Sequence, residues 1–262
     1  MSTAGLRDQP EARSVVLLHG FMGSGADWRP VAARLAQRHR CHCPDLPGHG
    51  KAPLPDALTW QGGCDLVESN LDGSAPKVLV GYSMGGRIAL QLAVRHPEAY
   101  GGLVLISASP GLSSAEERAQ RAIWVQTWTD AFRSEPIDDV LVRWYAQDVF
   151  RSLRQRPELL DTILKKRRCN NPATLARVLE SLDVSLQPDL RQSLGVLTMD
   201  VLVIAGAEDA KYCGLMDELA GAMAPVRRVI VPDAGHTIHL EQPEALSGIL
   251  EGFMAGLDPN QG

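Results

Sequence analysis

The chain has 262 residues, which suits one α/β domain with an inserted segment. It is 45% hydrophobic and 22% charged, with a mean hydropathy of −0.09, so it can bury a sizeable core. A net charge of −5 and a pI of about 5.8 give no basis for expecting nucleic acid or an anionic membrane as partner. No apolar run is long enough to span a bilayer, and residues 1–13 lack a signal pattern, so we expect a cytoplasmic protein.

Short apolar runs alternate with helical patterns along most of the chain, which is typical of a parallel sheet flanked by helices. Strands are expected at residues 14–18, 39–43, 77–81, 102–106, 201–204 and 228–231. Helices with 3.6-residue periodicity are expected at residues 27–37, 63–71, 84–95, 214–223 and 243–257. The predicted fold class is therefore α/β, with a mostly parallel sheet.

The alternation breaks between residues 110 and 194, where only helical patterns occur. Helices are expected there at residues 114–132, 136–145, 157–167 and 171–183. We therefore predict a core of residues 1–109 and 195–262, and a helical lid insertion of residues 110–194. In open α/β sheets ligands bind at the carboxyl edge of the strands, so this is the edge that the lid should cover.

The five cysteines are odd in number and form no C-x-x-C motif, so no disulfide framework is expected. His39, Cys41, His42 and Cys43 lie close together in sequence. On a strand, Cys41 and Cys43 share one face while His42 points to the other, so these side chains do not converge readily on one metal ion. We expect neither a metal site nor a cofactor.

Residues 81–85 form a G-x-S-x-G motif around Ser83. The motif follows an apolar run and precedes a helical pattern, which is the strand–turn–helix context of the nucleophile elbow in the α/β-hydrolase fold. Such a turn is too sharp for side chains at the two glycines. It would place Ser83 at a helix N-terminus, where backbone N–H groups favour a nearby anion. The alternative is a G-x-S-x-G that occurs by chance. Such a motif would have no reason to lie between a strand and a helix.

A serine nucleophile needs a base, and the base needs a group that orients it. In this fold the order along the chain is Ser, Asp, His. Asp209 and His236 each come just beyond the end of an expected strand, at the sheet edge where Ser83 emerges. Glu208 and His239 are the rival candidates, but the first comes one residue earlier and the second begins the next helical turn. We predict a Ser83–His236–Asp209 triad.

Residues 19–23 follow the first strand, the place from which this fold supplies its second oxyanion donor. We expect the backbone N–H groups of Phe21 and Met84 to form the oxyanion site. The loop of residues 44–50, with the sequence PDLPGHG, is expected to be a rigid structural element. We expect its His49 to pack or to form hydrogen bonds rather than to catalyse.

Arg87 lies four residues after Ser83, one turn along the same helix face. A cation in the first turn opposes the helix dipole by roughly 0.3–1 kcal/mol, so its presence suggests a bound anion near the nucleophile. The alternative is a surface arginine that pairs with a carboxylate.

With Arg87 included, residues 81–87 resemble the nucleophile segment of the 2-succinyl-6-hydroxy-2,4-cyclohexadiene-1-carboxylate synthases, α/β-hydrolase-fold enzymes of menaquinone (vitamin K2) biosynthesis. The similarity continues at residues 19–24, 45–50, 110–117, 144–145, 149–150, 170–175, 187–191 and 234–236. It thus spans nearly the whole chain beyond the first dozen residues. The matches within residues 110–194 matter most, because lids diverge fastest among relatives that share only the core.

The resemblance implies a lyase that eliminates pyruvate from 2-succinyl-5-enolpyruvyl-6-hydroxy-3-cyclohexene-1-carboxylate, a small anionic tricarboxylate, without consuming water. Ser83, activated by His236, would remove the ring proton next to the succinyl ketone, and oxyanion donors would stabilise the developing enolate.

The resemblance also implies substrate contacts from Tyr82, Arg87, Arg121, Trp144 and Arg167. Two features depart from the family pattern. Residues 153–166 contain an insertion, so Lys166 or Arg168 could replace Arg167, and Gln126 and Thr127 stand where a more basic helix face is expected. Unpaired buried arginines are costly, so we expect the three arginines to lie in a water-filled pocket until substrate carboxylates arrive.

Two other functions fit parts of the sequence. A carboxylesterase, or a hydrolase that cleaves a C–C bond of a vinylogous diketone, would use the same triad and would turn over small aryl esters. A non-catalytic ligand-binding protein of this fold would have no need to keep Ser83, Asp209 and His236 together. The fold by itself does not choose among these functions, and the arginines of the lid favour the lyase.

Overall fold

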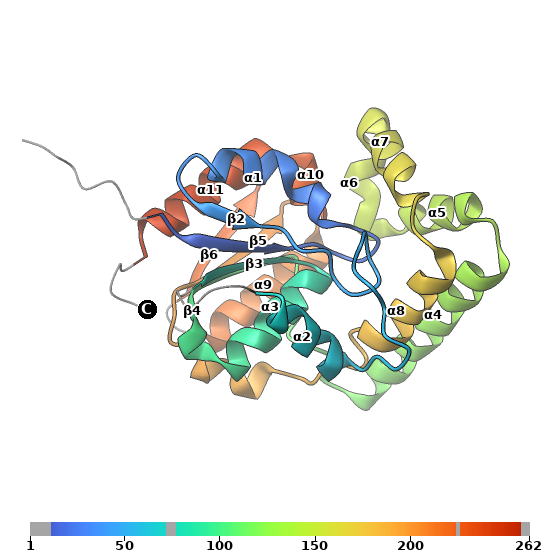
Figure 1. The fold of residues 1–262 in the computed structure, drawn as a ribbon, viewed down its shortest axis with the longest axis horizontal. Coiled ribbons are helices and arrows are strands. Elements are labelled where there is room, and N and C mark those ends of the chain that lie inside the picture. The colour runs from blue at the N-terminus through green and yellow to red at the C-terminus, as the bar shows by residue number, and fades with distance from the viewer. Residues whose placement is uncertain (1–11, 72–76, 224–225, 258–262) are drawn as a thin grey trace, which may run out of the picture.

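Residues 12–71, 77–223 and 226–257 are described by the computed structural model. Its centre is a six-stranded sheet in the order β2-β1-β3-β4-β5-β6, in which every neighbouring pair is parallel (Figure 1). The strands are β1 (Ser14–Leu18), β2 (Arg40–His42), β3 (Lys77–Tyr82), β4 (Tyr100–Ile106), β5 (Val201–Gly206) and β6 (Val226–Val231). The expected α/β class and parallel sheet are confirmed, and strand ends differ from the predicted ones by no more than two residues.

Helices cover both faces of the sheet (Figure 1). One face is covered by α1 (Arg29–Leu35) and α11 (Pro243–Ala255), and the other by α2 (Trp60–Ser69), α3 (Met84–Arg95) and α9 (Ala210–Ala222). In β3, Val78 and Val80 pack toward the first layer while Leu79 packs toward the second. Burial on both faces explains why the strands are continuously apolar rather than alternating.

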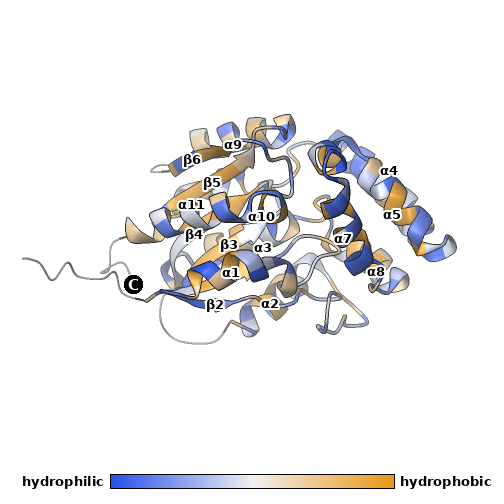
Figure 2. Cartoon of the chain, turned by 90° about the horizontal axis from the view of Figure 1, so that it is seen from above, coloured by the Kyte–Doolittle hydropathy of each residue, from blue (hydrophilic) through white to orange (hydrophobic). Residues whose placement is uncertain are grey.

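A group of helices lies between β4 and β5 in sequence and beyond the carboxyl ends of the strands in space (Figures 1 and 2). It consists of α4 (Ala115–Ser134), α5 (Ile137–Ala146), α6 (Arg151–Arg154), α7 (Pro157–Arg167) and α8 (Pro172–Leu182). These helices form their own apolar cluster, which includes Phe132, Leu153 and Leu175 and takes in Met22 from the core. Helix α6 was not predicted, because four residues are too short to show a helical period.

Side-chain caps decide where several helices begin. Ser114 Oγ accepts a hydrogen bond from Glu117 N at 3.1 Å, and Glu117 Oε2 accepts one from Ser114 N at 3.1 Å, so the expected capping box opens α4. Helix α9 begins four residues before its predicted start, because the Asp209 carboxylate accepts a hydrogen bond from Tyr212 N at 3.3 Å and serves as its N-cap.

The turn from β3 to α3 lies directly against the backbone of β1. A Cβ on Gly85 would come within 2.3 Å of Leu18 O, and one on Gly81 within 2.5 Å of Gly85 O. Between these glycines Ser83 adopts φ 50° and ψ −110°, a conformation that non-glycine residues rarely take. The glycines are therefore required by close contact with backbone atoms.

A buried ion pair joins α7 to the core. Arg167 Nη2 lies 2.6 Å from Asp27 Oδ2 in the 3-10 helix η1 (Gly25–Trp28), and the two side chains are only 7% and 1% exposed. The Nε of Arg167 also donates a hydrogen bond to Tyr145 Oη at 3.4 Å. Burial by itself would raise the pKa of Asp27, but the charge and hydrogen bond of Arg167 outweigh burial and lower that pKa.

Residues 1–11, in which we find no signal pattern, lie outside the described residues. Within the described ranges, no helix is both long and apolar enough to cross a bilayer.

We expect Gly85→Ala to lower the free energy of unfolding by about 2–3 kcal/mol, because the added methyl group would overlap the carbonyl of β1. Gly248→Ala in α11 is the matched control: its Cβ would meet no atom within 4 Å, so we expect no loss. Urea denaturation of both variants measures the difference, and equal stabilities would contradict the close contact.

We expect Asp27→Asn to cost on the order of 3 kcal/mol at neutral pH, because it leaves the buried Arg167 charge without its partner. The pKa of Asp27 is lowered from 3.8 in the folded state, so its contribution is fully present above that value and is lost as pH falls through the lowered one. Urea denaturation at several pH values should show a constant gap between wild type and variant above about pH 5, and a narrowing gap below about pH 4. A gap independent of pH would argue against a charged Asp27.

Candidate active site

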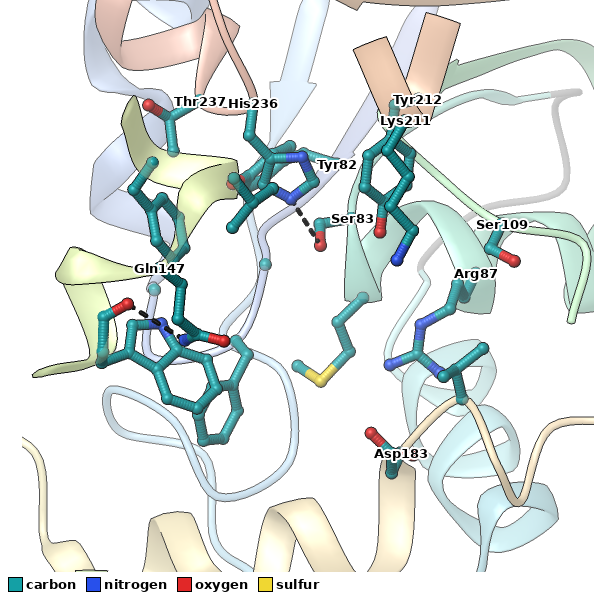
Figure 3. Close-up of a pocket in the computed structure, with 18 of the residues that line it drawn as sticks. Tyr82, Ser83, Arg87, Ser109, Gln147, Asp183, Lys211, Tyr212, His236 and Thr237 are labelled. Carbon is teal, nitrogen blue, oxygen red and sulfur yellow. Dashed lines mark hydrogen bonds between the residues drawn. The ribbon is translucent and has the colours of Figure 1, made fainter. Parts of the chain in front are cut away.

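Ser83, His236 and Asp209 follow the carboxyl ends of β3, β6 and β5, and His236 lies within hydrogen-bond distance of the other two. Figure 3 shows the contact between Ser83 and His236. His236 Nε2 lies 3.2 Å from Ser83 Oγ, and His236 Nδ1 lies 2.8 Å from Asp209 Oδ2. Both His236 and Asp209 are only 5% exposed, whereas Ser83 is half-buried and lines a cavity. This arrangement lets the carboxylate orient the imidazole and lets the imidazole exchange a proton with the serine.

The two rival residues lie differently. Asp209, and not its neighbour Glu208, makes the contact with His236. His239 is buried between the rings of Tyr82 and Trp28, with ring centroids 4.3 and 4.8 Å away. Burial lowers the pKa of His239 to about 3, so it is neutral at physiological pH. The geometry therefore favours Asp209 and His236 as the orienting group and the base.

Three aromatic rings surround the imidazole of His236. The centroids of Tyr212, Tyr82 and Phe150 lie 4.6, 5.3 and 6.1 Å from its own. Of these, Tyr212 and Phe150 were not predicted as site residues. Tyr212 could have been found from its place in the first turn of α9, three residues after Asp209, whereas Phe150 comes from the helical insertion and only the tertiary structure brings it here.

Phe21 and Met84, whose backbone N–H groups are the predicted oxyanion donors, both line the cavity that contains Ser83. In the part of the chain that the structure describes, neither N–H is paired with an acceptor. Met84 opens α3 immediately after Ser83, so its N–H also lies at the positive end of that helix. The arrangement suits an anion that develops beside the serine.

Two buried histidines support the loop that carries Phe21. His49 Nε2 accepts a hydrogen bond from Met22 N at 3.0 Å, and His19 Nε2 accepts one from Leu46 N at 2.9 Å. Burial lowers the pKa of His19 to about 4 and that of His49 to about 3, so both are neutral acceptors. The hydrogen-bonding role expected for His49 thus agrees with its contacts.

A cavity of about 680 Å³ lies above Ser83, between the core and the helical insertion. The predicted substrate residues Tyr82, Arg87, Arg121, Trp144 and Arg167 line it, as do Ser83, His236, Phe21 and Met84. Neither of the alternatives to Arg167 lines it. Arg168 pairs with Asp138, and half-exposed Lys166 places its Nζ 3.8 Å from Asp27 Oδ1.

Two of the three arginines are already paired, so the expectation that all three await substrate unpaired is wrong. Arg121 donates to Asp183 Oδ2 through Nε at 2.9 Å and Nη2 at 2.8 Å, and its guanidinium carbon lies 3.5 Å from the centroid of the Trp124 ring. Arg167 pairs with Asp27. The physical reason is the cost of burying a guanidinium, which a nearby carboxylate offsets.

Arg87 is different, because the described residues give it no carboxylate partner. Its Nη2 donates to Leu182 O at 2.8 Å and its Nη1 to Gln187 Oε1 at 3.4 Å, and its guanidinium carbon lies 5.1 Å from the Trp60 ring centroid. Desolvation lowers the pKa of Arg87 to about 10, so it remains a cation at neutral pH. The surface ion pair that we considered for Arg87 is absent from this arrangement.

Lys211 and Asp183 are further site residues that were not predicted. Lys211 lies on the cavity rim in the first turn of α9, and its ammonium points toward the same space as the Arg87 guanidinium (Figure 3). Its position two residues after Asp209 is the sequence feature from which its place in the site could have been predicted. Asp183 ends α8, and nothing in the local sequence links it to Arg121, which lies 62 residues away.

Comparisons with known proteins place this site in a family. Residues 15–249 match the family model described as the alpha/beta hydrolase family. The chain is 37% identical over 233 residues to the 2-succinyl-6-hydroxy-2,4-cyclohexadiene-1-carboxylate synthase of Escherichia coli, covering 87% of this chain and 88% of that one. It is 35% identical over 240 residues to the synthase of Salmonella enteritidis, covering 90% and 91%.

Solved structures show the same fold. A structure of MenH from S. aureus matches with a TM-score of 0.88 and 22% identity, covering 95% of each chain. An enol-lactonase from Burkholderia xenovorans matches with a TM-score of 0.78 and 25% identity, covering 96% of this chain and 94% of that one. The chain therefore belongs to the α/β-hydrolase family, and within it to the enzymes homologous to 2-succinyl-6-hydroxy-2,4-cyclohexadiene-1-carboxylate synthase, a lyase of menaquinone biosynthesis.

Proposed function

We propose that this enzyme eliminates pyruvate from 2-succinyl-5-enolpyruvyl-6-hydroxy-3-cyclohexene-1-carboxylate and so forms 2-succinyl-6-hydroxy-2,4-cyclohexadiene-1-carboxylate. The observation that carries the proposal is Arg87, a cation without a carboxylate partner among the described residues, one helical turn from Ser83. A nucleophile near a cation that has no ion-pair partner of its own suits a substrate that carries negative charge close to its reacting atoms. The synthases to which the chain is similar are named for the same carboxylate product.

In the proposed mechanism, His236 accepts the proton of Ser83 as the serine oxygen removes the ring proton next to the succinyl ketone. The electron pair of that C–H bond moves onto the ketone oxygen, which becomes an enolate held by the N–H groups of Phe21 and Met84. The pair then returns through the ring double bond and breaks the C–O bond to the enolpyruvyl group. The leaving enolate takes the proton and becomes pyruvate, so no water and no redox cofactor are consumed.

The substrate has three carboxylates, and several cations line the cavity. Arg121 lies close enough to Arg87 and Lys211 to influence their charge, whereas Arg167 is paired with Asp27. The ion pairs of Arg121 and Arg167 fix each guanidinium before substrate arrives, which reduces the entropy lost on binding. The rings of Tyr82 and Trp144 supply apolar surface between these charges.

We also propose that residues 110–194 act as the lid of this cavity. Supporting this, the helices of that region lie over the carboxyl edge of the sheet and contribute Trp144, Phe150 and Leu179 to the cavity wall. A covered site excludes water, which would otherwise weaken the charge interactions and protonate the enolate.

Hydrolysis of an ester is the alternative that the same site could support, because the triad and the two N–H donors also suit a tetrahedral intermediate. A neutral ester, however, carries no negative charge that Arg87 could bind. A small aryl ester is therefore the informative comparison substrate.

We expect Ser83→Ala to lower kcat for pyruvate release by about 10³-fold or more, because the oxygen that contacts the ring proton is removed. The measurement is pyruvate formation from freshly prepared substrate, with an aryl ester assayed in parallel on wild type and variant. Rapid ester cleavage with no pyruvate from the wild-type enzyme would instead identify a hydrolase.

We expect Arg87→Ala to lower kcat/KM for pyruvate release by about 100-fold, because one charge-assisted contact with a substrate carboxylate is lost. Arg95→Ala, at the other end of α3, is the matched control: Arg95 pairs with Asp65 at 2.8 Å and lies outside the cavity. Steady-state kinetics and thermal melting are measured on both variants. A large fall in melting temperature with unchanged kinetics would mean that Arg87 serves only to hold the end of α8.

A further inference from the structure

The turn that carries His236 is held from the core side by a buried carboxylate. Glu241 is 6% exposed and accepts hydrogen bonds from Gly235 N at 3.1 Å, from Thr237 N at 3.0 Å and from Thr237 Oγ1 at 2.6 Å. The two backbone donors lie on either side of His236. The carboxylate of Glu241 thus fixes the backbone from which the imidazole projects.

The same turn is held from the other side by an arginine of the helical insertion. Arg156 lies between α6 and α7, and its Nη1 donates to Glu241 O at 2.7 Å while its Nη2 donates to Asp233 O. Asp233 has a φ of 51°, so the turn begins in a backbone conformation that needs support. One guanidinium therefore bridges the start of the turn and the end of the short helix α10 (Ile238–Glu241) that follows it.

Neighbouring residues of the helical insertion pack against the same turn. A Cβ on Gly235 would come within 2.0 Å of Ser152 Oγ, and the Phe150 ring lies 6.1 Å from the His236 ring. Residues 150–156, which we call the docking segment, therefore cover the turn at three points. The space left around the turn is too small for the backbone to shift without displacing this segment.

From these contacts we propose that Arg156 is a positioning residue for His236, so that the base is aligned with Asp209 and Ser83 only while the docking segment is seated. The proposal rests on the proposed triad. Arg156 does not line the cavity, so it acts through the turn rather than on substrate.

A purely structural contact between insertion and core is the competing explanation, and Arg177 provides its control. From α8, Arg177 Nη2 donates to Pro55 O at 2.5 Å and to Asp56 O at 3.0 Å. It resembles Arg156 in joining the insertion to two carbonyl oxygens of the core, but it lies outside the cavity and far along the chain from the His236 turn.

The test compares Arg156→Ala, Arg156→Lys and Arg177→Ala in the full chain. We expect Arg156→Ala to lower kcat about tenfold while KM changes less than about twofold, because the base is misplaced but the cavity is intact. Lysine keeps the charge but replaces the two donor nitrogens of Arg156 by one, so Arg156→Lys should recover kcat only in part. Arg177→Ala should lose thermal stability while its kcat stays at the wild-type value.

Proton NMR of the enzyme without substrate supplies the second readout, and it does not depend on which reaction the enzyme catalyses. We expect the downfield resonance of the His236 Nδ1 proton, shared with Asp209, to broaden or shift in both Arg156 variants and to stay unchanged in Arg177→Ala. If Arg156→Ala does not fold, Arg156→Lys carries the test. Wild-type kcat and an unchanged resonance in the Arg156 variants, with only the melting temperature lowered, would overturn the proposal.

Discussion

Ser83 is held in a left-handed backbone conformation because the backbone of β1 passes directly beneath the turn that carries it. This contact fixes the rest of the site. It places the N-terminus of α3, which begins at Met84, against the cavity, and it places Arg87 one turn further on. The strain of a non-glycine residue in this region is offset by the close packing of Gly81 and Gly85 around it.

The arrangement of charged side chains around the cavity reflects the free-energy cost of burying a charge. Arg121 and Arg167 each have an aspartate partner, while Arg87 donates to a carbonyl and an amide oxygen and has no carboxylate within ion-pair distance among the described residues. The cavity therefore contains cations whose positions are set in advance and whose net charge stays positive near Ser83. The guanidinium groups are already ordered before an anionic substrate binds. Binding would therefore require little further movement of these side chains.

The helical insertion is joined to the core by cations placed around the cavity. Arg167 reaches η1, Arg87 reaches the end of α8, and Arg156 reaches the turn that carries His236. Because these contacts surround the site, movement of the insertion would alter the geometry of the site itself. If the insertion serves as the proposed lid, these contacts would physically link substrate access to the alignment of His236.

Local pattern in the sequence was enough to predict the sheet, most helices and three polar residues that meet at the carboxyl edge of the sheet. The strands are short apolar runs, α3 has the predicted bounds of residues 84–95, and G-x-S-x-G needs a sharp turn wherever it occurs between strand and helix. The meeting of Ser83, Asp209 and His236 could also be foreseen, because in a parallel sheet the carboxyl ends of all strands lie at one edge.

Only the tertiary structure decided the partners of the buried charges and the surroundings of His236. Asp27 lies 140 residues from Arg167, and Asp183 lies 62 residues from Arg121, so no helical or strand period connects them. The contact between Arg156 and the His236 turn likewise spans 85 residues to Glu241. Periodicity reports which face of an element is buried, whereas the partner of a buried charge depends on how distant elements pack against each other.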